Sequence, residues 1–174
     1  GVSYQLLYGG SSVGSPVAGT GAGINFGLQT GAGTYTVAGT NVTTGCSSNM
    51  TGSAVITINP LPTIFTVSGG GGYCAGGAGV TITLSGSTVG VNYMVYNGAT
   101  LVTTIIGTGS PLSYLATTAG TYTVVAKTVA TSCTNNMLGS ALVTINPLPT
   151  VYPVTGTGSY CAGGAGVHVL LGSS

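Results

Sequence analysis

The 174-residue sequence contains no aspartate, glutamate, arginine or tryptophan, and only one lysine, Lys127, and one histidine, His168. Charged residues form 1% of the chain, whereas soluble domains carry about 25%. Without carboxylates, a paired-acid active site, an aspartate-supported catalytic triad and a carboxylate calcium site are excluded. A formal net charge of +1 gives little attraction to phosphate, so nucleic acid is not an expected partner. We therefore expect a protein that is not an enzyme and has no cofactor.

Long apolar runs are also missing, because Thr, Ser and Gly interrupt every hydrophobic stretch. No run approaches the roughly 18 residues that indicate a membrane span. Apolar residues nevertheless form 43% of the chain, which is enough for a folded core. No basic segment followed by an apolar one is present, so we expect any export signal to lie outside this sequence.

What the chain does contain is a repeat with a period of about 87 residues. Three motifs occur twice at this spacing: YCAGGAGV from Tyr73 and Tyr160, GTYTV from Gly33 and Gly120, and NPLPT from Asn59 and Asn146. GVSY at Gly1 likewise matches GVNY at Gly90. The copies differ by two single-residue insertions or deletions, both in Gly/Ser/Thr-rich stretches that are typical of turns.

Apolar and polar residues alternate with period two between the turns, which is the pattern of β-strands. β-Branched residues and Gly are abundant and helix formers are scarce, so helices are not expected. One repeat unit contains seven expected strands, near 64–68, 79–85, 91–96, 101–106, 111–116, 120–128 and 138–145. This number of short strands predicts an all-β fold of tandem immunoglobulin-like β-sandwich repeats. Tyr35 and Tyr122 begin the sixth strand, where they form either a tyrosine corner or ordinary core contacts.

The repeat divides the chain into three parts. Residues 1–61 correspond to the C-terminal part of a sandwich (strands C to G), 62–148 to a complete domain, and 149–174 to the first two strands of the next domain. The Pro-rich segments between them predict stiff interdomain joints, since Pro fixes φ; their prolines are Pro60, Pro62, Pro147 and Pro149. Alternatively, these prolines only protect edge strands from pairing.

The order YCAGG, a GVxY strand, GTYTV, a Cys and then TINPLP resembles the Ig-like or PKD-like repeats of large secreted surface proteins of Bacteroidota. The resemblance covers the whole chain. It implies a secreted, cell-surface location, export by the type IX secretion system and arrangement in long tandem arrays. The chain departs from many such repeats because it lacks Asp and Glu, and because Tyr93 stands where a strand-C Trp is often found.

Four cysteines in a repeated chain of low charge indicate an oxidising location, and they allow three pairings. Zinc-site spacing is absent, so no metal site is expected. The repeat pairs Cys74 with Cys133 inside the complete domain, at a separation of 59 residues. Cys46 and Cys161 would then pair between successive copies, because joining the end of one copy to the start of the next gives the same separation.

These features predict a non-catalytic structural subunit of an extracellular bacterial filament or stalk, whose partners are identical copies joined head to tail. Two arrangements remain open. The chain is either a window on a longer polyprotein or a discrete subunit whose last two strands, near 149–171, complete the truncated domain of the next copy.

Two further hypotheses concern the surface. Outward apolar residues are candidates for lateral contacts between protofilaments, or are ordinary surface residues; they are Val55, Met94, Val125 and Leu142. The alternative function is an adhesin that binds glycans through the Gly-rich loops at Tyr73 and Tyr160, although Gly there also serves tight turns.

Overall fold

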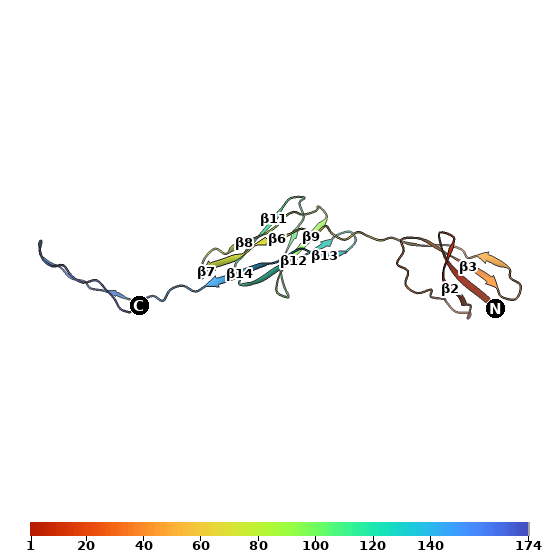
Figure 1. Ribbon diagram of the computed structural model, residues 1–174, viewed down its shortest axis with the longest axis horizontal. Coiled ribbons are helices and arrows are strands. Elements are labelled where there is room, and N and C mark those ends of the chain that lie inside the picture. Colours follow the sequence, from red (N-terminus) through yellow and green to blue (C-terminus); the bar gives the residue numbers. More distant parts are fainter. Residues whose placement is uncertain (174) are drawn as a thin grey trace. The chain divides into compact units, whose positions relative to one another are not determined.

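A computed structural model describes residues 1–173 and shows an all-β protein (Figure 1). Only strands, turns and irregular segments occur among these residues. The chain divides into two compact units, Gly1–Pro60 and Leu61–Ser174. We call the first the N-terminal unit. Within the second, we distinguish the central sandwich, residues 62–148, from the C-terminal segment, residues 149–173. The prediction of an all-β fold is confirmed.

One sheet of the central sandwich has the strand order β10-β9-β12-β14-β7, and β13 pairs with one end of β12. Its neighbours are antiparallel except β14 and β7, which are parallel. The strands are β7 (Gly71–Cys74), β9 (Val91–Asn97), β10 (Thr100–Ile106), β12 (Gly120–Thr128), β13 (Thr134–Asn136) and β14 (Ala141–Asn146).

The other sheet has the order β11-β8-β6 and is antiparallel. Its strands are β6 (Val67–Gly69), β8 (Val80–Leu84) and β11 (Leu112–Ala116). The chain passes from β6 to β7, and so from one sheet to the other, at Gly69 and Gly70. Their φ angles of 92° and 82° lie in the left-handed region that glycine adopts without strain.

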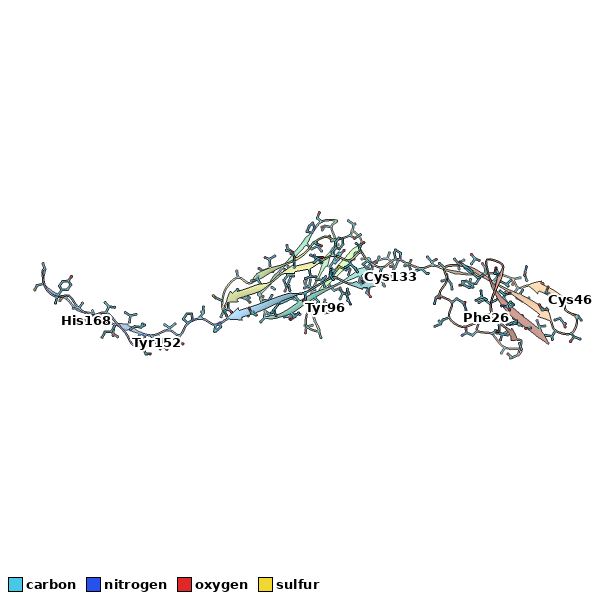
Figure 2. The ribbon with its side chains drawn as sticks, viewed as in Figure 1. Phe26, Cys46, Tyr96, Cys133, Tyr152 and His168 are labelled. Atoms are coloured by element: carbon cyan, nitrogen blue, oxygen red, sulfur yellow. The ribbon has the colours of Figure 1, made fainter. Side chains whose placement is uncertain are left out.

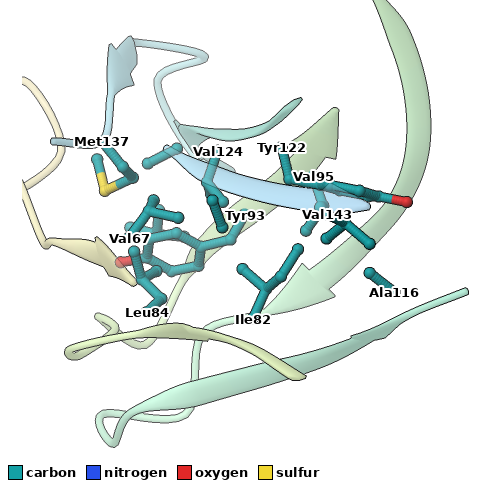
Figure 3. Packing of buried hydrophobic residues seen from close by; sticks show 13 residues of the cluster. Val67, Ile82, Leu84, Tyr93, Val95, Ala116, Tyr122, Val124, Met137 and Val143 are labelled. Atoms are coloured by element: carbon teal, nitrogen blue, oxygen red, sulfur yellow. The ribbon is translucent and has the colours of Figure 1, made fainter. Parts of the chain in front are cut away.

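The core of the central sandwich lies between its two sheets (Figure 3). Tyr93 and Tyr122, with exposed fractions of 1% and 0%, are its largest fully buried side chains together with Val143. Along β12, the buried Tyr122, Val124 and Ala126 alternate with the exposed Thr121 and Thr123. The predicted period-two alternation is therefore present in the folded chain.

Both repeat tyrosines make the hydrogen bond of a tyrosine corner. The Tyr122 hydroxyl donates to the carbonyl oxygen of Thr118 at 2.9 Å, and the Tyr35 hydroxyl to that of Gly31 at 3.1 Å. In each case the acceptor is four residues upstream, as this motif requires. Of the two interpretations of these residues, the tyrosine corner is the one that the geometry supports.

The N-terminal unit is a single sheet with the order β2-β1-β3-β4, and β5 also pairs with β3. Its strands are β1 (Val2–Tyr8), β2 (Ser11–Ala18), β3 (Gly33–Asn41), β4 (Ser47–Asn49) and β5 (Ala54–Ile56). By the repeat, these strands correspond to β9, β10, β12, β13 and β14. The sequence predicted strands C to G here, but strand E, the counterpart of β11, is not formed: residues 23–30 belong to no strand.

The C-terminal segment contains two short strands, β15 (Val154–Thr155) and β16 (Leu170–Leu171), which pair antiparallel. No residue of this segment is buried over the described range 149–173. Its pairing nevertheless copies that of the central sandwich. Val154 is opposite Leu171, just as its counterpart Val67 is opposite Leu84.

Candidate self-assembly site

The inner face of the N-terminal sheet lacks the cover that its counterpart has. Met137 is 6% exposed in the central sandwich, whereas its repeat partner Met50 is 39% exposed. Ala141 is 1% exposed, whereas Ala54 is an exposed residue. Since the residue types are identical, the difference arises from what lies over the sheet. In the central sandwich that cover is the sheet β11-β8-β6.

An open cavity marks the position of the missing sheet. It has a volume of about 430 Å³, and its lining includes Tyr4, Ile24, Phe26 and Val37. Phe26 lies on the irregular segment that follows β2 (Figure 2). A second cavity of about 260 Å³ adjoins it along the same face and shares Phe26, Val37 and Met50. The N-terminal unit therefore has a hollow, mainly apolar face.

The equivalent space in the central sandwich is almost filled. It measures about 20 Å³ and is lined by the four counterparts of those residues, Tyr93, Leu112, Tyr114 and Val124. The same lining also contains Ile82 and Leu84 from β8. Those two side chains have no counterpart inside the N-terminal unit, so a strand equivalent to β8 is what the hollow lacks.

The lack of a strand equivalent to β8 also explains why residues 23–30 are irregular. Its counterpart β11 pairs with β8 and with no other described strand. There, Leu112 is opposite Leu84 and Tyr114 is opposite Ile82. A strand at a sheet edge needs a hydrogen-bonding neighbour to form. Without one, residues 23–30 form no strand, and Gly27, which stands where β11 has Leu115, adopts a φ of 79°.

The C-terminal segment carries the side chains that the hollow lacks. By the repeat, Val154, Val169 and Leu171 correspond to Val67, Ile82 and Leu84. The latter three are 4%, 3% and 4% exposed in the central sandwich, but the former are 68%, 74% and 56% exposed. Burying such a side chain fully contributes about 1.5–3 kcal/mol. Covering these three side chains would therefore contribute several kcal/mol from burial alone.

The chain enters and leaves the central sandwich at opposite ends. At the entry end, the Asn135 side-chain amide donates to the carbonyl oxygen of Pro62 at 2.9 Å. At the exit end, Asn146 closes β14 opposite Cys74. Of the four predicted joint prolines, Pro62 is buried and the other three are exposed.

The predicted disulfide between Cys74 and Cys133 is wrong. Cys133 lies in the hairpin from β12 to β13, where its carbonyl accepts from the Thr128 amide at the entry end (Figure 2). Cys74 lies at the exit end, beyond the start of β12. Nine residues of β12 separate them, a length of about 26 Å, whereas a disulfide requires Cα atoms within roughly 7 Å. No two of the four cysteines lie at disulfide distance.

The two loop tyrosines differ in their surroundings. The Tyr73 hydroxyl donates to the carbonyl oxygen of Thr117, which holds the Gly-rich turn after β7 against the end of β11. Its counterpart Tyr160 is 63% exposed on the C-terminal segment. This geometry favours the structural role of the Gly-rich turn over the adhesin hypothesis.

The remaining candidate residues lie at the surface or are half-buried. Lys127 and His168 are exposed. Within residues 1–173, no three His, Cys, Asp or Glu side chains gather in a way that could hold a metal ion. The described chain also has no helix long and apolar enough to cross a membrane. Of the candidates for lateral contacts, Val55 and Leu142 are 70% and 60% exposed, and Met94 and Val125 are half-buried.

Comparison with models of known protein families gave no match, and comparison with curated proteins gave none either. The repeat predicted the two partial domains, because it placed one part of a sandwich at each end of the chain. Sequence reasoning did not single out Phe26, Val37, Val169 or Leu171, although aligning them with the central repeat would have identified them.

Proposed function

We propose that this protein is a non-catalytic structural subunit of an extracellular filament that assembles by strand complementation. Residues 149–171 of one copy lie over the N-terminal sheet of the next and complete it as an immunoglobulin-like sandwich. One observation carries the proposal. The N-terminal unit exposes side chains whose counterparts are buried in the central sandwich. The C-terminal segment exposes the counterparts of the β6 and β8 side chains that cover them in that sandwich.

The central sandwich provides the geometry of the completed domain. Val169 would lie opposite Phe26 and Leu171 opposite Ile24, as Ile82 and Leu84 lie opposite Tyr114 and Leu112. Residues 158–161 would pair in parallel with the strand that continues β5, as β7 pairs with β14. Adding strands to an open sheet edge is a recurrent mode of protein association, in which main-chain hydrogen bonds give affinity and side-chain pockets give specificity.

The immunoglobulin-like assignment has two supports. The order β10-β9-β12-β14-β7 facing β11-β8-β6 corresponds to sheets C′-C-F-G-A′ and E-B-A of that family of sandwiches. The hydrogen bond of the Tyr122 hydroxyl is the corner expected at the start of strand F.

Head-to-tail assembly follows from the opposite positions of entry and exit on the central sandwich. A segment that leaves at the exit end reaches a neighbouring copy without passing back along its own domain. Since donor and acceptor faces differ, each copy is both donor and acceptor, and such a contact builds an open filament when the rotation between copies does not close a ring. The extracellular, cell-surface location is supported by the resemblance of the motifs to secreted repeats of Bacteroidota.

The test compares two variants of the full chain. Val169→Asn with Leu171→Asn puts polar groups where the completed core would be, while Leu170→Thr changes only an outward position whose counterpart is the exposed Thr83. We expect the unchanged chain and Leu170→Thr to form filaments by light scattering and electron microscopy. The double variant should stay monomeric, with its central sandwich folded because the changes lie outside it. An unchanged chain that remains monomeric at every concentration, or a double variant that assembles equally well, would refute the proposal.

A further inference from the structure

The two ends of the central sandwich carry one cysteine each. Cys74 is exposed at the exit end. Cys133 lies at the entry end, and its repeat counterpart in the N-terminal unit is Cys46. Cys46 is exposed in the hairpin from β3 to β4, where its carbonyl oxygen accepts from the Asn41 amide at 2.9 Å. This hairpin is built like that of Cys133, whose carbonyl accepts from Thr128 at 2.9 Å.

Completion of the N-terminal sheet does not bring the cysteines of one sandwich together. In the completed domain, the donated Cys161 takes the place of Cys74 and lies at its exit end, while Cys46 lies at its entry end. The pair Cys46–Cys161 expected from the sequence is thus separated by the length of a strand, like the pair Cys74–Cys133. A disulfide along the polymer would instead join the exit end of one sandwich to the entry end of the next.

The position of each cysteine along the chain axis can be read from its neighbours. Cys74 is in register with Asn146. At the entry end, residues 62–66 run parallel to 134–138, since Thr66 bridges Leu138 and the Asn135 side chain binds the Pro62 carbonyl. The residue two before Asn135, Cys133, is therefore level with residues 60–61, one or two positions before Pro62.

Transferring this register to the joint between two copies places two cysteines at similar heights along the chain. Pro149 is the counterpart of Pro62, so Cys46 of the next copy is level with residues 147–148. Cys74 is level with Asn146, one or two positions earlier. An extended chain rises about 3.1–3.3 Å per residue, so the two cysteines differ in height by about 3–7 Å. A disulfide spans Cα atoms about 4.4–6.8 Å apart.

We infer that Cys74 of one copy and Cys46 of the next form a disulfide across the joint, which makes the polymer covalent. This inference rests on the proposed function, because strand complementation is what brings the two copies together. The bond forms by thiol–disulfide exchange with a small disulfide such as oxidised glutathione. One cysteine thiolate displaces the first glutathione thiolate, and the second cysteine thiolate displaces the other. Two protein thiols are thereby oxidised, and one glutathione disulfide is reduced to two thiols.

The test uses two matched variants of the 174-residue chain, each with two cysteines left. Cys133→Ser with Cys161→Ser keeps only Cys46 and Cys74, whereas Cys74→Ser with Cys133→Ser keeps only Cys46 and Cys161. Both are assembled and then oxidised with glutathione disulfide. On a non-reducing denaturing gel, the first variant should give a ladder in steps of the 16.7 kDa subunit that collapses on reduction. The second should remain a single band, because its cysteines lie at opposite ends of the completed sandwich.

The failures of the two proposals can be told apart by electron microscopy of the same samples. Filaments of the first variant that remain without cross-links overturn the disulfide and leave the proposed function intact. A ladder in the second variant but not in the first also overturns it, in favour of pairing within the completed domain. A chain that forms no filaments under any of these conditions overturns the strand complementation and, with it, the disulfide.

Discussion

The N-terminal unit and the central sandwich share the motif GTYTV and a set of equivalent strands but reach different structures. In both, β1 with β3 and β9 with β12 form the same pairing, in which Leu6 lies opposite Val37 and Val95 opposite Val124. Only the central sandwich has a second sheet and a closed core. Local sequence therefore forms this sheet, whereas covering it depends on strands that come earlier in the repeat.

In the N-terminal unit, pairing within a sheet occurs apart from packing against a second sheet. Pairing within the five-stranded sheet survives without the opposite sheet, as β1–β5 show. The segment equivalent to β11, residues 23–30, forms no strand pairing. In the central sandwich, β11 pairs only with β8 among the described strands, so this segment depends on a neighbouring strand rather than on its own alternation.

The largest effect is expected when the strands that the N-terminal unit lacks are supplied as a separate peptide. A chain ending at Leu148 loses a segment of which no described residue is buried, so the central sandwich should remain folded. Adding a peptide of residues 149–173 should then convert residues 23–30 into a strand. We expect amide hydrogen exchange there to slow by about 100-fold or more, because opening would cost several kcal/mol. A peptide carrying Val169→Asn and Leu171→Asn is the control, and equal protection by both peptides would contradict the proposed pairing.

A smaller effect is expected from removing the same methionine in each unit. Met137→Ala should destabilise the central sandwich by about 2–5 kcal/mol, as for a buried large-to-small change. Met50→Ala should cost the N-terminal unit less than about 1 kcal/mol in the unassembled chain, since Met50 is 39% exposed and leaves no closed cavity. Exchange of β12 and β3 amides under denaturant measures the two units separately, in the monomeric Val169→Asn, Leu171→Asn background. Equal costs would show that the N-terminal sheet is already covered.

The sequence predicted the features that neighbouring residues determine and missed those that depend on distant parts of the chain. The strands of the central sandwich followed from period-two alternation, because each residue's burial is set by the sheet face on which it lies. The strand β7, Gly71–Cys74, was missed, since its Gly-rich sequence has no alternation. The short β13 was missed because three residues are too few for a periodic signal.

The cysteine pairing failed for a different reason. A separation of 59 residues states how far apart two cysteines are along the chain, but not at which end of a strand each one lies. Cys74 closes a strand that runs parallel to β14, and Cys133 lies in a hairpin at the other end. Such placement depends on strand direction and sheet order, which become known only with the fold.

Removing the hydroxyl of Tyr73 or of Tyr160 tests the contribution of a single hydrogen bond to stability and to assembly. Tyr73→Phe deletes the bond to the Thr117 carbonyl and should destabilise the central sandwich by about 1 kcal/mol. Tyr160→Phe should leave the monomer unchanged, because Tyr160 is 63% exposed. In filaments, Tyr160→Phe should raise the critical concentration for assembly about fivefold, the equivalent of about 1 kcal/mol. An unchanged critical concentration would mean that the donated turn is not held as the turn at Tyr73 is.

The smallest expected effect concerns Tyr114, whose counterpart in the N-terminal unit is Phe26. Burial, and secondarily the neighbouring Tyr122 phenol, raise the pKa of Tyr114 above its ordinary value. The unfolded chain then releases this proton at a lower pH than the folded chain does. The contribution of Tyr114 to stability is complete below pH about 10 and is lost as the pH rises through its folded pKa.

Tyr114→Phe should therefore reduce the alkaline loss of stability while keeping the ring that lies 6.0 Å from Tyr122. The measurement is the denaturant midpoint of the central sandwich at pH about 9 and about 11, on either side of the ordinary tyrosine pKa. The decrease between these two values should be smaller in the variant than in the unchanged protein, whereas the midpoints at the lower pH should be similar. A variant that loses as much stability as the unchanged protein would show that the titration of Tyr114 is not coupled to folding, and that Phe26 and Tyr114 are interchangeable at every pH.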